Sequence, residues 1–246
     1  MTLTADLGLA SAQGNGLNLR YRRLGPRDVR TPVVYLHGIG GSSADWLEVA
    51  SALDHPGVAL DARGHGESDW SPTAEYSTDA HFADLACAMD ALGIERCVLA
   101  GYSMGGGVAM LAAHALGERV ERLVIVDTYP APEMTAGSQQ IAYWLADGPP
   151  TRAGRPAFDP AISEAFRRDL AGGVGRMDLW PHWDALECPV LLVRGGGSRV
   201  LPPELALEMI ARQPLARLVT IEGATHGLLR HAPDSLAAAM CAFLEE

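Results

Sequence analysis

The chain has 246 residues, of which 48% are hydrophobic, and this length suits a single domain with a full hydrophobic core. Its 19 basic residues are all arginines and are outnumbered by 30 acidic residues, which gives a formal net charge of -11. An acidic chain without a basic cluster argues against binding to nucleic acid or to an anionic membrane surface.

The amino terminus and the cysteines predict a cytoplasmic protein. Residues 1–14 have no basic region and carry Asp6, unlike a secretory signal, and no apolar run approaches the length of a membrane span. The four cysteines stand in apolar settings without paired spacing, a pattern that predicts buried thiols rather than disulfides or a metal site. We therefore expect a cytoplasmic chain that binds neither nucleic acid nor membrane.

The chain opens with a predicted β-hairpin. Residues 6–13 and 17–24 are two extended segments around Gly14-Asn15-Gly16, and asparagine with glycine is typical of a hairpin turn. The apolar run 33–36 then predicts a strand that is buried on both faces.

A glycine-rich turn, His37-Gly38-Ile39-Gly40-Gly41-Ser42, follows this strand. Such a turn can bind phosphate, but its glycines fall at the wrong intervals and no Lys-Ser/Thr pair follows, so a nucleotide site is disfavoured. We expect instead that the backbone N–H of Ile39 stabilises negative charge on a substrate oxygen. His37 and Gly38 are expected to shape the turn and to lie against the substrate.

The next elements are a helix at 42–53, a strand at 57–61 and a helix at 78–92. Between the last two lies Asp61-Ala62-Arg63-Gly64-His65-Gly66-Glu67-Ser68, a loop in which Asp61 and Arg63 are expected to fix the backbone. Asp61, His65 and Asp69 are possible metal ligands, but nothing nearby completes a set, so no metal site is predicted.

The segment 97–113 is predicted to be a strand, a tight turn and a helix, with Gly101-Tyr102-Ser103-Met104-Gly105 at the turn. In that context a Gly-x-Ser-x-Gly sequence is typical of a nucleophile elbow, where only glycine lets strand and helix approach. The hydroxyl of Ser103 is then exposed, and the amide of Met104 points toward charge on a substrate oxygen. A turn that merely packs a helix onto a sheet is the alternative.

The second half of the chain continues the alternation of strands and helices. A strand at 122–126 ends at Asp127, and the region 128–184 is rich in Pro and Gly, with helix-like pieces at 138–146 and 160–171. Strands are predicted at 189–194 and 217–222 and helices at 203–213 and 233–244. This order predicts an α/β fold with a mostly parallel sheet covered by helices on both faces.

Four motifs resemble those of the α/β-hydrolase fold superfamily, in the family's order. They are His37-Gly38, Asp61 to Ser68, Gly101 to Gly105, and Gly223-Ala224-Thr225-His226-Gly227. The resemblance implies one domain over residues 1–246, an eight-stranded sheet, and a short helical cap inserted after the sixth strand at residues 129–185. It says much less about the substrate, because this fold hosts many reactions.

The resemblance also places the cap over the active site, so its aromatic side chains are candidates for an apolar substrate pocket. For any one of them, a place in the core of the cap is an equally good interpretation. The residues expected to contact substrate are Tyr102 of the elbow and Tyr129, Trp144, Trp180, His182 and Trp183 of the cap.

A nucleophilic serine needs a base, and the base needs a carboxylate that orients it. His226 stands in the loop after the last strand, where the family has its histidine. Many relatives have an Asp after the seventh strand, but this chain has Ser198 there. Asp127, at the end of the sixth strand, is the expected replacement, as in some lactone hydrolases of this fold. A role in capping the strand is the alternative.

These residues predict a serine hydrolase that cleaves a small apolar carboxylic ester or lactone without a metal or organic cofactor. Hydrolysis of a carbon–carbon bond in a β-diketone-like substrate uses the same groups and is an alternative. A cofactor-free oxygenase with His226 and Asp127 as its base is another. The missing acid after the seventh strand also leaves open a non-catalytic small-molecule receptor.

Overall fold

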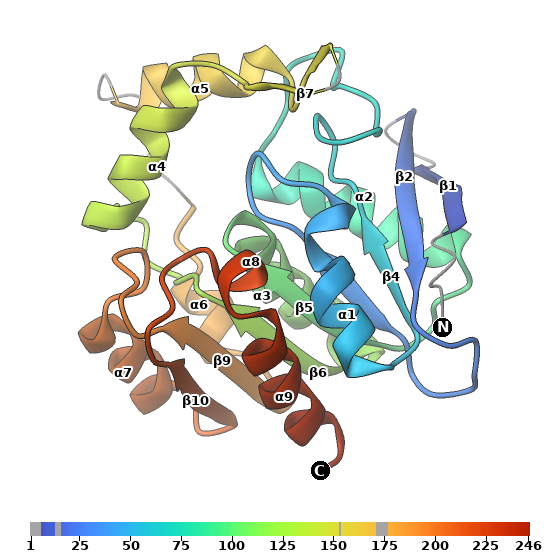
Figure 1. The fold of residues 1–246 in the computed structure, drawn as a ribbon, viewed down its shortest axis with the longest axis vertical. Coiled ribbons are helices and arrows are strands. Elements are labelled where there is room, and N and C mark those ends of the chain that lie inside the picture. The colour runs from blue at the N-terminus through green and yellow to red at the C-terminus, as the bar shows by residue number, and fades with distance from the viewer. Residues whose placement is uncertain (1–5, 13–15, 153, 171–176) are drawn as a thin grey trace.

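The computed structural model describes residues 6–12, 16–152, 154–170 and 177–246. At its centre is an eight-stranded sheet in the order β1-β2-β4-β3-β5-β6-β9-β10 (Figure 1). The antiparallel pairs are β1 with β2 and β2 with β4, and the other neighbouring strands are parallel. The predicted α/β fold class is therefore confirmed. The strands are β1 (Asp6–Ala12), β2 (Leu17–Leu24), β3 (Val33–Leu36), β4 (Gly57–Leu60), β5 (Cys97–Tyr102), β6 (Val120–Val126), β9 (Val190–Gly195) and β10 (Ala216–Ile221).

The predicted hairpin is present, with Ala12 of β1 opposite Leu17 of β2. Residue 13, at the predicted end of the first strand, and residues 14–15 of the predicted turn lie outside the described residues, as does residue 171 at the predicted end of the helix that begins at 160. The structure describes all four cysteines, and no disulfide joins them. None of the described helices is both long and apolar enough to cross a membrane.

Helices cover both faces of the sheet, and two hydrophobic clusters form the core between them (Figure 1). In β3 successive side chains point alternately into the two clusters, and all four are buried, so both faces of this strand must be covered. One face carries α1 (Leu47–Leu53), α8 (Leu228–His231) and α9 (Pro233–Leu244), and the other carries α2 (Thr78–Ala91), α3 (Met104–Leu116), α6 (Trp180–Asp184) and α7 (Pro203–Arg212). A 3-10 turn at Ser43–Trp46 occupies the first part of the helix predicted at 42–53.

The segment between β6 and β9 contains α4 (Ala136–Ala146), β7 (Thr151–Arg152), β8 (Arg155–Pro156), α5 (Pro160–Leu170) and α6. Helices α4 and α5 lie together beyond the end of the sheet, whereas α6 packs beside α3 (Figure 1). The hydroxyl of Thr135 donates to the carbonyl of Val200 after β9, at 3.0 Å. The amide of Asp159 donates to the carbonyl of Gly64 after β4, at 2.8 Å. The pair α4 and α5 is thus anchored on both sides of β5.

The loop after β4 contains a buried ion pair. Arg63 donates to Asp84 of α2 through Nε at 2.6 Å and Nη2 at 2.7 Å, and both residues are 3% exposed. Asp61 accepts from the amides of Ser43 and Glu67, at 2.7 and 2.9 Å. The prediction that Asp61 and Arg63 fix the backbone and its neighbours is therefore confirmed.

Beside this ion pair, burial keeps His81 neutral and makes the stability of the protein dependent on pH. Burial lowers the pKa of His81 from 6.5 to about 4; Arg63 and His37 act in the same direction, while Asp84 and Glu75 oppose it. As the pH falls, the imidazole takes up its proton at a higher pH in the unfolded chain than in the folded protein. Stability that is present above pH 6.5 is therefore lost as the pH falls toward 4. For His81 alone the loss is roughly 3 kcal/mol.

We expect the midpoint of thermal unfolding to fall between pH 6.5 and 4, and to fall less steeply in His81→Gln. The measurement is a series of melts across this range. His231→Gln, at an exposed histidine, is the matched control and is expected to keep the wild-type slope. Equal slopes in wild type and His81→Gln would contradict the assignment.

Candidate active site

Ser103 lies between β5 and α3 with φ of 51° and ψ of -116°, a conformation that is rare for a residue with a side chain. A Cβ on Gly101 would lie 2.3 Å from the carbonyl oxygen of Gly105. A Cβ on Gly105 would lie 2.5 Å from the carbonyl oxygen of Leu36. Only glycine allows strand and helix to approach this closely. The predicted strand, tight turn and helix are therefore confirmed.

His226 reaches both Ser103 and Asp127 from the loop between β10 and α8. Its Nε2 is 3.1 Å from Oγ of Ser103, and its Nδ1 is 2.7 Å from Oδ2 of Asp127. An ionised carboxylate can only accept, so Nδ1 carries the proton and Nε2 is free to accept from the serine hydroxyl. The structure brings together the three residues that were predicted as nucleophile, base and acid.

Asp127 is fully buried and accepts two further hydrogen bonds. The amide of Gly195 donates to Oδ1 at 3.0 Å, and the hydroxyl of Ser198 donates to Oδ2 at 2.5 Å. Ser198 itself accepts from the amide of Val200 at 3.1 Å. Ser198, which follows β9, is therefore hydrogen-bonded to Asp127, which follows β6. This contact was missed from the sequence, where the only signal was a serine at the position of the family's acid.

The amides of Ile39 and Met104 lie on the two segments that meet at the nucleophile. The amide of Gly105 donates to the carbonyl of His37 at 3.1 Å, which holds the glycine-rich turn against the start of α3. Within the described part of the chain, neither the Ile39 amide nor the Met104 amide finds a hydrogen-bond acceptor. Both are thus available to an oxygen atom of a substrate.

The ring of His37 is committed to the backbone and is almost fully buried. The amide of Ala62 donates to Nε2 at 3.0 Å, so Nδ1 carries the proton and donates to the carbonyl of Gly38 at 2.7 Å. The predicted contact of this ring with substrate is therefore wrong, while its expected role in shaping the turn is confirmed. The backbone of Gly38 lies beside Ser103, because a Cβ there would be 3.2 Å from the serine Cβ.

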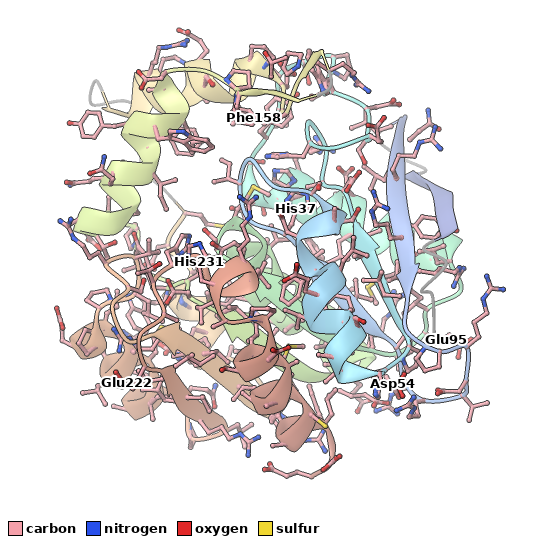
Figure 2. The ribbon with its side chains drawn as sticks, in the orientation of Figure 1. His37, Asp54, Glu95, Phe158, Glu222 and His231 are labelled. Carbon is pink, nitrogen blue, oxygen red and sulfur yellow. The ribbon has the colours of Figure 1, made fainter. Side chains whose placement is uncertain are left out.

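Trp144 of α4 lies over the glycine-rich turn. A Cβ on Gly40 would be 3.3 Å from the indole, and the ring centroid of Trp144 is 6.5 Å from that of Phe158. In Figure 2, His37 lies at one end of the sheet, and Phe158 lies in the segment beyond that end. Trp144 is half exposed, at 48%. Its contact with substrate stays a prediction.

Two of the predicted substrate contacts, Tyr129 and Trp183, are core residues. The hydroxyl of Tyr129 is 2.7 Å from that of Ser138, and its ring belongs to the hydrophobic cluster on the α3 face. Trp183 is fully buried and donates from Nε1 to the carbonyl of Met209 at 2.9 Å. Their predicted roles in the pocket are wrong, because both rings fill space between the sheet and its covering helices.

Trp180 and His182 are also placed away from the nucleophile. The ring of Trp180 faces the guanidinium of Arg212 of α7 at 3.9 Å. Nδ1 of His182 lies 2.8 Å from Nδ1 of His114, which is in the last turn of α3. Ser103 is at the opposite end of that helix, before its first turn. Helix α6 thus packs beside α3, and the contact of Trp180 and His182 with substrate stays a prediction.

Tyr102 is partly buried beside His226, and its hydroxyl donates to the histidine carbonyl at 2.9 Å. Its predicted contact with substrate is not the contact that the structure displays. The described residues contain no group of three or more His, Cys, Asp or Glu side chains placed to hold a metal ion.

A family model for the alpha/beta hydrolase fold matches residues 31–164. The sn-1-specific diacylglycerol lipase ABHD11 of Mus musculus is 30% identical, with 96% of this chain and 88% of that protein covered. Esterase YbfF of Escherichia coli K12 is 26% identical, with 94% and 99% covered. Among solved structures, an α/β hydrolase of Novosphingobium aromaticivorans superposes with a TM-score of 0.82 at 25% identity, covering 100% of this chain and 99% of that one.

Proposed function

Because this chain belongs to the α/β-hydrolase fold family, we propose that it is a serine hydrolase that cleaves a carboxylic ester or lactone through an acyl-enzyme on Ser103. The observation that carries the proposal is the continuous contact from Ser103 to His226 to Asp127, at 3.1 and 2.7 Å. Relatives named as an esterase and as a diacylglycerol lipase support ester cleavage.

In the proposed reaction, Oγ of Ser103 attacks the carbonyl carbon of the ester while Nε2 of His226 takes the hydroxyl proton. Buried Asp127 stabilises the imidazolium that results. The amides of Ile39 and Met104 donate to the oxyanion of the tetrahedral intermediate. The intermediate then collapses, His226 protonates the leaving alcohol, and the acyl group remains on Ser103.

Hydrolysis of the acyl-enzyme repeats these steps with water. His226 takes a proton from the water as its oxygen attacks the acyl carbon, and the same proton returns to Ser103 as the acid product leaves. With a lactone, the alcohol and the acid belong to one molecule, so the product is a hydroxy acid. Every proton is carried by the imidazole, and no metal or organic cofactor takes part.

The surroundings of Ser103 favour a substrate with an apolar portion near the glycine-rich turn. Ile39, Trp144 and Phe158 place apolar side chains on that side. Hydrolysis of a carbon–carbon bond would use the same groups, but no separate feature favours it. The receptor hypothesis depended on a missing acid, and the carboxylate 2.7 Å from His226 weighs against it.

The test combines a panel of p-nitrophenyl esters of increasing chain length, a panel of lactones, and labelling with a fluorophosphonate. We expect turnover of at least one class and a covalent adduct that mass spectrometry locates on Ser103. Ser103→Ala is the labelling control. An adduct without turnover of any ester or lactone would favour the receptor, and absence of both adduct and turnover would refute serine hydrolysis.

A further inference from the structure

Tyr102 touches the three parts of the site at once. It precedes Ser103 in the elbow, and its hydroxyl donates to the carbonyl oxygen of His226 at 2.9 Å. Its ring centroid lies 5.0 Å from that of the His226 imidazole, with 31° between the planes. On the other side, a Cβ on Gly38 would be 2.8 Å from the tyrosine ring. The ring thus fills the space between the histidine loop and the glycine-rich turn.

The hydroxyl of Tyr102 stays protonated and so remains a hydrogen-bond donor. Burial, and secondarily the charge of Asp127, raises the pKa of Tyr102 well above its ordinary value of 10. The hydroxyl therefore keeps its proton at any pH at which the protein works. A backbone carbonyl can only accept, so the bond to His226 has one possible direction.

Tyr102 holds the histidine loop at the backbone of His226 itself, the residue that carries the imidazole. The His226 carbonyl accepts from the Tyr102 hydroxyl and from the amide of Leu228, which begins α8. The bond from Leu228 is local, since it comes from the same loop. The bond from Tyr102 joins residues 124 positions apart and ties this loop to the elbow that carries Ser103.

We propose that Tyr102 is a positioning residue that sets the distance of the His226 imidazole from Ser103. This role rests on the proposed serine hydrolysis and replaces the predicted contact of Tyr102 with substrate. The imidazole has two targets, Oγ of Ser103 at 3.1 Å and Oδ2 of Asp127 at 2.7 Å. A loop that shifts by a fraction of an ångström lengthens the first contact and slows every proton transfer.

The first test is Tyr102→Phe, which keeps the ring and removes only the hydroxyl. We expect kcat for a p-nitrophenyl ester to fall about tenfold while KM changes less than about twofold, since misplacing a catalytic group lowers the rate and not ground-state binding. Labelling by a fluorophosphonate should slow in parallel. A raised KM with unchanged kcat would assign Tyr102 to substrate binding, and unchanged values of both would also overturn the proposal.

The second readout needs no substrate. In protein with nitrogen-15-labelled histidine, the Nδ1 proton of His226, held by Asp127, gives an NMR resonance that we expect to broaden in Tyr102→Phe. An unaltered resonance would overturn the positioning role. Because this measurement does not depend on turnover, it separates failure of the positioning role from failure of the proposed hydrolysis.

Tyr35→Phe is the matched control. Tyr35 of β3 is fully buried, and its hydroxyl has no hydrogen-bond partner among the described residues, so the same atom is removed without touching the histidine loop. We expect wild-type kcat, KM and His226 resonance in this variant. A tenfold loss of kcat in Tyr35→Phe as well would show that the effect in Tyr102→Phe is not specific to the bond with His226.

Discussion

Ser103→Ala is expected to lower kcat for ester hydrolysis by about six orders of magnitude, with the fold intact. The deleted oxygen is the atom that forms the acyl bond, and among the described residues Ser103 carries the only hydroxyl that is hydrogen-bonded to Nε2 of His226. The fold survives because the Ser103 side chain is partly exposed and its hydroxyl is bonded to His226 alone among the described residues. Steady-state kinetics and circular dichroism check the two halves of this prediction.

The outcome that would refute the nucleophile is activity within a few-fold of wild type. In that case His226 and Asp127 would act as a base without an acyl-enzyme, as in the cofactor-free oxygenase alternative. An inactive variant that had lost its helical signal would be uninformative by itself. Ser103→Gly then serves as a second variant, because glycine relieves the backbone at φ of 51° while removing the same hydroxyl.

Asp127→Asn is expected to lower kcat by about four orders of magnitude. The amide of Gly195 donates to Oδ1, so the asparagine oxygen stays there and its NH₂ group takes the place of Oδ2. That group then donates to Nδ1 of His226, and the ring proton moves to Nε2. An imidazole protonated at Nε2 cannot accept the hydroxyl proton of Ser103. The measurement is kcat against wild type under identical conditions.

Ser198 supplies the controls for this variant. In Ser198→Ala, Asp127 loses one donor but keeps its charge, so we expect a loss of only about tenfold. Ser198→Asp in the Asp127→Asn background returns a carboxylate to this site and should recover part of the activity. If Asp127→Asn kept most of the wild-type activity, Asp127 would not be the residue that orients His226.

The sheet and the elbow could be predicted from the sequence because their signals are local. Strand β3 has four consecutive apolar residues, and a strand that is buried on both faces needs that pattern. At the elbow, glycines on either side of Ser103 are required by the approach of α3 to β5. The position of Asp127 followed from the rule that parallel strands present their carboxyl ends on one edge.

The aromatic residues of the inserted segment could not be placed in the same way. A tryptophan is equally suited to a pocket and to a core, and the choice depends on where the element that carries it packs. Helix α6 packs beside α3, so Trp183 fills the core, whereas Trp144 on α4 lies over the glycine-rich turn. His37 was misjudged for a similar reason, since the donor to its ring is Ala62 from another strand's loop.

The acid at the end of β6 has a consequence for the order in which the protein becomes reactive during its synthesis. Ser103 and Asp127 directly follow two paired neighbouring strands, β5 and β6, and both residues are synthesised early in the chain. His226 arrives almost 100 residues later, from the loop after the last strand. A serine without its base is a poor nucleophile, so the growing chain carries an inert hydroxyl. We expect the nascent protein to resist fluorophosphonate until the loop after its final strand has brought His226 to Ser103, which makes reactivity a report of that late step of folding.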